Sequence, residues 1–325
     1  MIYDALIVGG GPAGLSAALA LGRANRTALL FDSGAYRNAG VKAMHTVLSR
    51  DGANPDEFRS IARSQIERYT TISLRKGYIT HAANEEIEPG YKGFKLTDGD
   101  GTVFNGRKLV LATGSQDILP DNIEGYKENW PQHIYQCLLC DGFDEKDYPI
   151  GVLAFDTPAY GHLSVMALKF NPSVTIYSNG GVPDAAPVQQ ALQTALACGA
   201  KLDDRKIRRL VNNGEGPARG VTIEFETGPS ATLGMLLHKP PTRNHGQHLI
   251  EQLGLKTGPS GDVAVDPMFT ESSVKGCIVA GDTSEVVKQA SLAMGSGTRA
   301  GAVVSLQLCN EEGAKALAAA KAGSS

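Results

Sequence analysis

The sequence has little of what marks a membrane, secreted or nucleic-acid-binding protein. Its 325 residues contain no run of about 18 apolar residues, so we expect no transmembrane helix. The N-terminal stretch MIYDALIVGGG lacks the basic start of a signal peptide, and five cysteines are too few for a disulfide scaffold. A formal net charge of −3 argues against a basic nucleic-acid-binding face. We therefore expect a cytoplasmic protein that binds neither membranes nor nucleic acid.

Aromatic residues are also scarce, whereas glycine is abundant. The chain has one Trp, 6% aromatic residues and 38 Gly. Glycine is favoured where the backbone must turn sharply or approach another group closely. The sequence therefore predicts several such places, and the first lies near the N-terminus.

An apolar strand is expected at 3–8 and an Ala-rich helix at 15–21. Between them lie a G-x-G-x-x-G pattern and its two inner residues: Gly9, Gly11, Pro12, Ala13 and Gly14. In this context the first glycine permits a turn, the second lets the backbone touch a pyrophosphate, and the third allows helix and strand to pack closely. The pyrophosphate would lie at the helix N-terminus, which carries a partial positive charge.

A second strand is expected at 27–31 and ends in Asp32. An acidic residue about 20 residues beyond the glycines can accept hydrogen bonds from a ribose diol. A ligand-free glycine turn is the alternative. Two strands, the turn and the acid together favour a dinucleotide site.

Two distant segments carry further small residues directly after expected strands. The strand at 108–112 leads into one segment, and the strand at 277–280 leads into the other. The residues of interest are Ala112, Thr113 and Gly114 in the first, and Gly281, Asp282, Lys288, Gln289 and Ala290 in the second. Ligands bind at the carboxyl ends of parallel strands, and a small-residue helix from Ala290 onward would let its N-terminus approach a ring system.

These three segments together resemble those of flavoproteins with two dinucleotide-binding domains. The resemblance implies bound FAD and an α/β fold with two Rossmann-like domains, the second inserted in the first. The FAD-binding domain would comprise 1–119 and 242–325. Residues 120–241 would form the insertion, which corresponds to an NADPH-binding domain.

The insertion contains a C-x-x-C pair followed by an acid: Cys137, Cys140 and Asp141. The pair could be half a zinc site, a redox pair or a coincidence. Zinc needs two more ligands, and only His133 lies nearby, so we expect no metal site. A redox pair is favoured because C-x-x-C lowers a thiol pKa and closes a small disulfide ring. Asp141 could move a proton as the pair opens and closes.

C-x-x-C-D-G in this position resembles low-molecular-weight thioredoxin reductase. The resemblance implies that Cys140 faces the flavin, that Cys137 exchanges disulfides with the substrate, and that Asp141 is the proton donor. The insertion differs from that family where NADPH should bind. After the strand at 149–155 come Asp156, Thr157 and Pro158 in place of a glycine turn, and no Arg or His follows the strand at 174–177. We therefore expect no NADPH binding.

The chain resembles the gliotoxin- and holomycin-type dithiol oxidases. The resemblance lies in the missing nicotinamide site and in the stretches around 130–137, Asn38 and His45. The resemblance implies a homodimer that closes an intramolecular disulfide in a small natural-product dithiol. Electrons would pass through the cysteine pair and FAD to O2, with hydrogen peroxide formed. Asn38 and His45 would lie near the flavin. Members of that group often carry His after the second cysteine, and Asp141 here leaves the direction of reaction open.

Two alternatives stay open: a disulfide reductase driven by NADPH or ferredoxin, and a non-catalytic protein with structural FAD. Of the remaining residues, Cys198, Cys277 and Cys309 are expected to be buried. His245 and His248 have the spacing of one helical face. The tail at 311–325 is expected to be a frayed helix.

Overall fold

The computed structural model describes residues 1–323, which divide into two compact units. Unit 1 comprises Met1–Ala39, Val47–Gln116 and the chain from Thr242 onward, and unit 2 comprises Gly40–Thr46 and Asp117–Pro241. The sequence places 40–46 in the FAD-binding domain, whereas the structure groups this segment with unit 2. The chain therefore enters unit 2 twice.

Unit 1 is built on a seven-stranded sheet with a parallel core and an antiparallel extension. The parallel strands, in sheet order, are β3 (Ile72–Lys76), β2 (Ala28–Asp32), β1 (Ile2–Val8), β6 (Val103–Leu111) and β17 (Cys277–Val279). The antiparallel strands are β5 (Tyr91–Asp98) and β4 (Ile79–Glu88), and β7 (Ser115–Asp117) pairs separately with β16 (Thr242–Asn244). Val8 aligns with Phe31 and Leu111, and Leu111 with Val279. The carboxyl ends of four strands therefore lie level at one edge.

The helices of unit 1 pack against both faces of this sheet. They are α1 (Pro12–Arg23), α2 (Pro55–Ile66), α7 (Gln247–Gln252), the 3₁₀ turn η1 (Gly281–Thr283) and α8 (Ala290–Ala322). Side chains of β1 alternate, so that Ala5 and Ile7 join the core beneath α1 and α8, whereas Leu6 and Val8 join the opposite core. Strands buried on both faces explain the continuous apolar run at the N-terminus.

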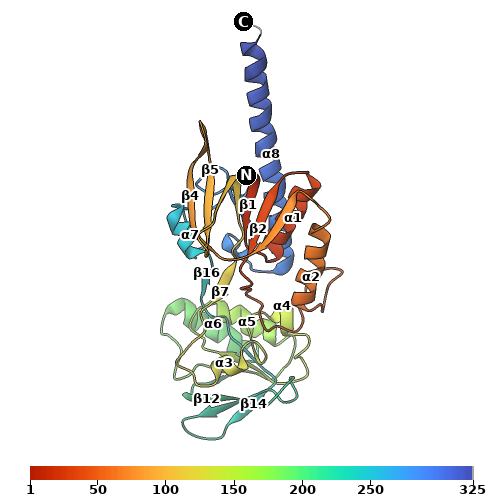
Figure 1. The fold of residues 1–325 in the computed structure, drawn as a ribbon. Coiled ribbons are helices and arrows are strands. Elements are labelled where there is room, and N and C mark those ends of the chain that lie inside the picture. Colours follow the sequence, from red (N-terminus) through yellow and green to blue (C-terminus); the bar gives the residue numbers. More distant parts are fainter. Residues whose placement is uncertain (324–325) are drawn as a thin grey trace. The chain divides into compact units, whose positions relative to one another are not determined.

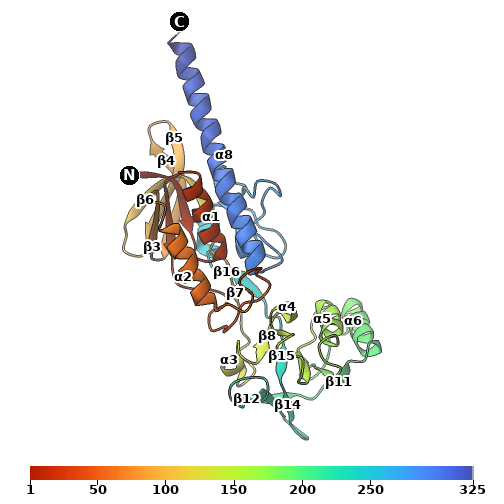
Figure 2. The same cartoon turned by 90° about the vertical axis from the view of Figure 1, so that its right-hand side faces the viewer.

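Helices α1 and α8 lie side by side in both ribbon views (Figures 1 and 2). A Cβ atom at Gly297 would lie 2.0 Å from the carbonyl oxygen of Ala13, and one at Gly301 would lie 2.8 Å from that of Ala17. From the sequence, the small residues of α8 are interpreted as letting the start of this helix approach a ring system. For these two glycines the structure shows a different cause, which is the close approach of α1.

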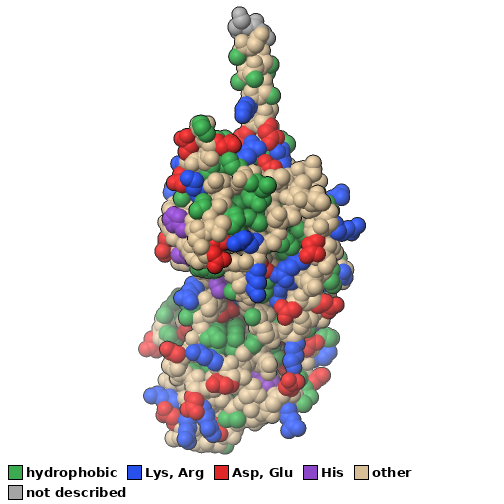
Figure 3. All heavy atoms as spheres, in the orientation of Figure 1, with side chains coloured by type: hydrophobic (Ala, Val, Ile, Leu, Met, Phe, Trp, Pro, Cys, Tyr) green, Lys and Arg blue, Asp and Glu red, His purple; other side chains and the backbone are tan. Residues whose placement is uncertain are grey.

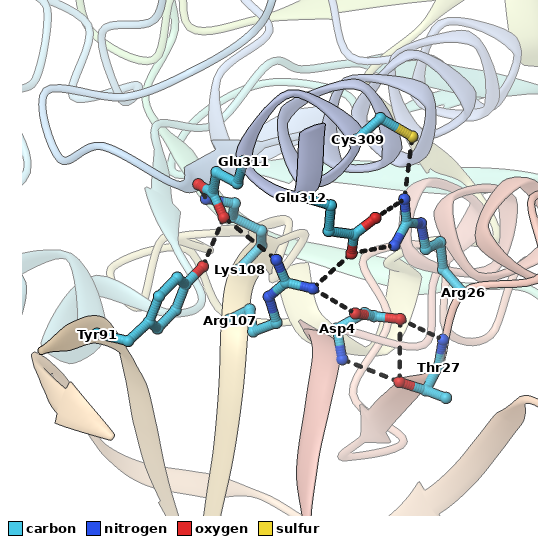
Figure 4. Close-up of polar contacts among 9 residues, drawn as sticks. All are labelled: Asp4, Arg26, Thr27, Tyr91, Arg107, Lys108, Cys309, Glu311 and Glu312. Atoms are coloured by element: carbon cyan, nitrogen blue, oxygen red, sulfur yellow. Dashed lines mark hydrogen bonds and ion pairs between the residues drawn. The ribbon is translucent and has the colours of Figure 1, made fainter. Parts of the chain in front are cut away.

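The C-terminal half of α8 is anchored by ion pairs to strand β6 and to the loop before β2 (Figure 4). Glu312 binds the guanidinium groups of Arg26 and Arg107, each at 2.7 Å, and Glu311 pairs with Lys108. The helix is continuous to Ala322, so the prediction of a tail frayed from residue 311 is wrong. Ser324 and Ser325 lie outside the described residues.

Unit 2 contains a five-stranded parallel sheet and a separate three-stranded antiparallel sheet. In sheet order the parallel strands are β11 (Lys201–Asp203), β10 (Val174–Tyr177), β9 (Ile150–Leu153), β15 (Met235–Leu237) and β8 (Ile134–Tyr135). The antiparallel strands are β12 (Ile207–Asn212), β13 (Val221–Phe225) and β14 (Ala231–Leu233), and the helices are α3 (Tyr126–Asn129), α4 (Leu138–Asp141), α5 (Ala159–Ala167) and α6 (Ala186–Ala197). The order β9–α5–β10–α6–β11 with parallel pairing is Rossmann-like. The predicted α/β fold with two Rossmann-like domains is confirmed.

Burial tests the remaining cysteines. Cys277 is buried in β17, as expected, whereas Cys198 and Cys309 are exposed, so the prediction is wrong for these two. Cys198 lies at the C-terminal end of α6, and Cys309 lies on α8 with its sulfur 3.0 Å from a guanidinium nitrogen of Arg26. Periodicity alone did not show which side of either helix faces the core.

The structure also bears on membrane and nucleic-acid binding, which the sequence argues against. Among residues 1–323, no helix combines the length and the apolar character needed to cross a membrane. On the face drawn in Figure 3, basic and acidic side chains are interspersed over the surface of the described residues.

Candidate redox disulfide and dinucleotide site

The turn between β1 and α1 explains each of its three patterned glycines. Gly9 has φ +122°, and a Cβ atom there would lie 2.1 Å from the carbonyl oxygen of Ala112. A Cβ atom at Gly14 would lie 1.8 Å from the carbonyl oxygen of Gly9. A Cβ atom at Gly11, in contrast, would meet no described atom within 4 Å. The first and third glycines are therefore required by packing, and the second faces open space.

The N-terminus of α1 has the properties of an anion-binding site. Gly11 is the N-cap residue, Pro12 opens the helix, and no described side chain caps it. The first turn contains no acidic residue. Because the first N–H groups of a helix have no partner within the helix, they and the helix dipole favour a phosphate here. The residues present therefore fit a dinucleotide.

The structure brings the three predicted segments of unit 1 together. The Thr283 hydroxyl accepts a hydrogen bond from the Gly114 N–H at 2.9 Å and lies 3.3 Å from the Thr113 hydroxyl. A Cβ atom at Gly281 would lie 2.8 Å from the Cβ of Ala13. The segment after β6, the segment after β17 and the start of α1 therefore meet at the carboxyl edge of the sheet.

Asp282 is held in place by its neighbours. The Ser115 hydroxyl donates to its Oδ2 at 2.9 Å, and the Arg37 guanidinium lies 3.4 Å from the same atom. The ammonium group of Lys288 donates to the Asp262 carboxylate at 2.7 Å and to the carbonyl oxygens of Asp282 and Glu285, both at 2.9 Å. All three hydrogens of this ammonium are therefore used within the protein, where Lys288 supports the turn that presents Asp282.

Asp32 lies at the end of β2, as expected, and its carboxylate already has protein partners. The Tyr36 hydroxyl donates to it at 2.6 Å, the Gly34 N–H donates at 2.9 Å, and Arg63 forms an ion pair with it. A ribose at Asp32 would share the carboxylate with these groups or displace one of them. The sequence argument missed Tyr36 and Arg63, because Arg63 lies 31 residues away on α2.

Asn38 and His45 belong to different units. The Asn38 side-chain oxygen accepts from the buried Arg59 guanidinium at 3.1 Å, and that guanidinium also lies over the Tyr36 ring at 3.8 Å. His45 belongs to unit 2, where its Nε2 lies 3.2 Å from the Asp144 carboxylate. The structure thus groups His45 with the acids that follow the cysteine pair.

Cys137 and Cys140 form a disulfide at the start of the one-turn helix α4, with a Cα–Cα distance of 5.3 Å. The N–H groups of Cys140 and Asp141 donate to the Cys137 carbonyl oxygen at 3.2 and 3.1 Å, and Leu138 is buried in the core of unit 2. One turn of helix therefore holds both sulfurs and the following acid in a fixed relation.

The zinc alternative finds no ligand set. Within residues 1–323, no three His, Cys, Asp or Glu side chains gather as metal ligands would. His133 is buried, with its Nε2 2.8 Å from the carbonyl oxygen of Gly214. One ring nitrogen of the nearest candidate ligand by sequence is therefore bonded to a backbone carbonyl.

Asp141 has the electrostatics of an acid–base group. Burial raises the pKa of Asp141 to about 7, His45 opposes this change, and the carboxylates of Glu145 and Asp144 reinforce it. A carboxyl group that titrates near neutral pH can both accept and return a proton. The sequence predicted the residue but gave no sign of the neighbours that tune it.

The second Rossmann turn, between β9 and α5, differs from the first. Ala154 has φ +57°, and Pro158 is the residue before α5. Phe155 and Tyr160 are buried, with ring centroids 5.9 Å apart, and the Asp156 N–H bonds back to the Ala154 carbonyl oxygen at 2.9 Å. Both aromatic side chains belong to the core of unit 2, and the turn lacks the glycine pattern of the first turn.

The edge after β10 is more mixed. Arg205 pairs with Asp203 at 2.6 Å, and Arg209 pairs with Glu224 at 2.8 Å, which agrees with an ion-paired surface. The aliphatic stem of Lys206, however, lies 3.2 Å from the position of a Cβ atom at Gly180. The sequence argument missed this basic residue at the edge where a 2′-phosphate would bind.

The spacing of His245 and His248 does not place both on one helical face, because α7 begins at Gln247. His245 precedes α7 and bonds through its N–H to the Gly114 carbonyl oxygen at 3.0 Å. His248 lies in α7, stacks on the Tyr78 ring at 5.2 Å and contacts the Ile79 carbonyl oxygen at 2.9 Å. The helix begins too late to include both.

Comparisons with known proteins agree with this architecture. Residues 3–158 match the model of the pyridine nucleotide-disulphide oxidoreductase family. The chain is 40% identical to thioredoxin reductase tcpT of Claviceps purpurea over 94% of both chains. It is 38% identical to thioredoxin reductase aclD of Aspergillus oryzae over 97% of this chain and 99% of that one. The solved structure of HlmI superimposes with a TM-score of 0.89 at 27% identity, covering 100% of this chain and 98% of that one.

Proposed function

We propose that this chain is a dithiol oxidase that uses FAD. It belongs to the thioredoxin-reductase-like pyridine nucleotide-disulphide oxidoreductases and is a flavin-dependent thiol/disulfide oxidoreductase. Its substrate would be a small-molecule dithiol of natural-product type, which it closes to an intramolecular disulfide. The electrons would leave to O2, with hydrogen peroxide formed. The family supports the chemistry, and the residues below support the finer assignment.

The residues that would hold FAD lie in unit 1. Gly11 and the N-terminus of α1 would bind the pyrophosphate, Asp32 the ribose, and the segments around Gly114 and Asp282 the remainder of the cofactor. Bound FAD would supply the two-electron redox chemistry that the protein's own side chains lack. The open space in front of Gly11 is the feature of this chain that most directly favours such a ligand.

The cysteine pair carries out the exchange with substrate. A substrate thiolate attacks the Cys137 sulfur and forms a mixed disulfide, and Cys140 leaves as a thiolate. The second substrate thiolate then attacks the substrate sulfur of the mixed disulfide and releases Cys137 as a thiolate. One substrate dithiol becomes a disulfide, the enzyme disulfide becomes two thiols, and both hydrogens are conserved. Asp141 would accept a proton from the attacking thiol and return it to a leaving thiolate.

One observation favours oxidation by O2 over reduction by NADPH. In unit 2 the turn after β9 contains Asp156 and Pro158, and it has no glycine pattern. A carboxylate repels phosphate, and proline removes an N–H donor that could bind one. The NADPH site of the family is therefore poorly supported in this chain.

An NADPH- or ferredoxin-driven disulfide reductase is the second candidate. The relatives tcpT and aclD are called thioredoxin reductases, and Lys206 lies beside Gly180 at the edge where a 2′-phosphate would bind. Such an enzyme would use the same cysteines in the opposite direction.

Oxygen uptake distinguishes the two candidates. Purified protein would be supplied with a small dithiol in one vessel, and with NADPH and oxidised thioredoxin in another. We expect oxygen consumption and hydrogen peroxide with the dithiol alone, and little NADPH oxidation. Saturable flavin reduction at micromolar NADPH would instead support the reductase. A protein that cannot be loaded with FAD would contradict both. Size-exclusion chromatography would test the homodimer that the resemblance implies.

A further inference from the structure

A second buried carboxyl group lies one helical turn beyond the catalytic acid. The Glu145 N–H donates to the Asp141 carbonyl oxygen at 3.3 Å, and the Glu145 residue is only 6% exposed. A carboxyl group of this kind is rarely buried without a partner, because desolvation of a charged carboxylate costs free energy. Its position next to Asp141 connects it with the cysteine pair.

The Glu145 carboxyl group competes with a backbone carbonyl for its one hydrogen-bond donor. The Tyr135 hydroxyl lies against two oxygens, the carbonyl of Gln132 and the Glu145 Oε1 at 3.0 Å. A phenol has one hydrogen, and a carbonyl can only accept. If the Tyr135 hydrogen points to Gln132, the contact with Glu145 is a hydrogen bond only when the carboxyl group donates. The other oxygen of Glu145 has no hydrogen-bond partner within residues 1–323.

The surrounding charges agree with this geometry. Burial raises the pKa of Glu145 to about 7; Asp144 adds to this rise, and a hydrogen bond donated by Tyr135 opposes it. The ionised form of Glu145 in turn raises the pKa of Asp141. The titratable groups facing this pair are Tyr135 from β8, Asp144 from the following loop and His45 from the segment 40–46. Two neighbouring groups that titrate in the same range do so as a coupled pair.

We propose that Glu145 is a positioning residue of the Cys137–Cys140 site: a carboxylic acid, oriented by Tyr135, that keeps Asp141 able to take up and return a proton during dithiol exchange. This proposal rests on the exchange step of the proposed function. It adds no redox partner, since the exchange itself converts one dithiol and one disulfide into one disulfide and one dithiol. Glu145 acts through its charge: when ionised it raises the pKa of Asp141, and when protonated it does not.

The test is the pH dependence of disulfide opening in the flavin-loaded, full-length protein. Dithiothreitol would open the Cys137–Cys140 disulfide without oxygen, and the thiols formed would be counted by alkylation and mass spectrometry. Glu145→Gln keeps the size and can still donate to Tyr135, but it cannot ionise. We expect the pH–rate profile to lose one ionisation and the midpoint assigned to Asp141 to fall by about one pH unit, the scale at which neighbouring sites couple.

Two further variants control for structure and charge. Asp147→Asn removes the same charge from an exposed residue two positions away and should leave the profile unchanged. Glu145→Asp restores a carboxyl group and should restore the second ionisation. A Glu145→Gln profile that superimposes on wild type overturns the proposal. So does a uniform loss of rate at every pH, because that is the result of a purely structural role.

A direct titration protects the test against a variant that does not fold. Carboxyl-¹³C NMR of the wild-type protein, with its disulfide closed, should show Glu145 titrating well above the usual glutamate range. Titration in the usual range would overturn the proposal. Neither readout uses oxygen or NADPH, so failure of the proposed oxidase activity leaves this test intact. Failure of any dithiol to open the pair would overturn both the exchange step and the proposal that rests on it.

Discussion

Both units contain a parallel strand followed by a turn and a helix, but the residues of the two turns differ. In unit 1 the turn has Gly9 at φ +122° and open space in front of Gly11. In unit 2 an alanine, Ala154, takes the positive φ, and Phe155 and Tyr160 are buried close by. The apolar strand and helix suffice for the fold in both cases. A nucleotide site needs in addition a turn that lets phosphates approach the backbone, and the two turns differ at the glycine positions that allow this.

The comparison also shows what unit 2 retains. Its redox pair lies on α4, outside the β9–α5 turn, so the pair does not depend on the lost glycine pattern. The disulfide and the β9–α5 turn are therefore separate elements of unit 2. Substitutions at the cysteine pair, in the first turn and in the second turn test these parts one by one.

The largest effect is expected at the cysteine pair. Cys137→Ser and Cys140→Ser should each abolish turnover with dithiols, because neither can form the Cys137–Cys140 disulfide. Cys140→Ser should also accumulate substrate on Cys137, since the partner that resolves the mixed disulfide is gone, and intact-mass spectrometry would detect the adduct. If Cys137→Ser traps the substrate instead, the two roles are reversed. Wild-type rates in both variants would remove the pair from the mechanism.

Gly9→Val should give the next largest effect. The new Cβ atom would overlap the Ala112 carbonyl oxygen at 2.1 Å, and φ +122° is unfavourable for any residue with a side chain. We expect loss of the yellow colour and a clear drop in Tm by differential scanning fluorimetry. Gly77→Val is the matched control, because a Cβ atom at Gly77 would meet no described atom within 4 Å. Equal behaviour of the two variants would contradict the role of Gly9 in the turn.

Gly11→Leu separates folding from ligand binding. The side chain would enter the open space in front of α1, so the protein should fold with a Tm close to that of the flavin-free wild type. Lost contacts to a charged phosphate cost about 1.5–3 kcal/mol each, or roughly ten- to a hundredfold in FAD affinity. Equilibrium titration with FAD measures the loss. Undiminished binding would place the pyrophosphate elsewhere.

Protonation of Asp141 links the cysteine pair to stability. The pKa of Asp141 is raised from 3.8 to about 7 in the folded protein. Because the folded state then holds a proton that the unfolded state has lost, stability should fall as pH rises from about 4 to about 7. Asp141→Asn should remove that decrease, raising Tm relative to wild type at pH 8 and leaving it similar at pH 4. The same direction of change at both pH values would indicate a packing effect.

Local patterns predicted the first turn and the cysteine pair well, because both depend on neighbouring residues. The convergence of Gly114 with Asp282 was also predictable, since parallel strands end at one edge of a sheet. Pairings between distant segments were not. His45 next to Asp144 and Arg63 at Asp32 each depend on chain segments whose meeting no periodicity encodes.

The same limit explains the errors on α8. An Ala-rich tail predicts fraying when it is considered alone. Glu311 and Glu312 bind Lys108, Arg107 and Arg26, which come from strand β6 and a loop far earlier in the chain (Figure 4). Long-range ion pairs of this kind decide where a helix is anchored, and they leave no local signal.

The smallest effect is expected at the second turn, and its sign distinguishes the two turns most sharply. Ala154 adopts φ +57°, where a side chain costs about 1–2 kcal/mol, whereas glycine is unstrained there but loses more entropy on folding, about 0.5–1 kcal/mol. Ala154→Gly should therefore raise the free energy of unfolding by up to about 1 kcal/mol, measured by urea denaturation. Ala231→Gly in strand β14 should lower it. NADPH should still reduce the flavin poorly in Ala154→Gly, because Asp156 and Pro158 remain. If this one glycine restores efficient reduction by NADPH, backbone conformation alone keeps the nucleotide out, and the argument from Asp156 and Pro158 fails.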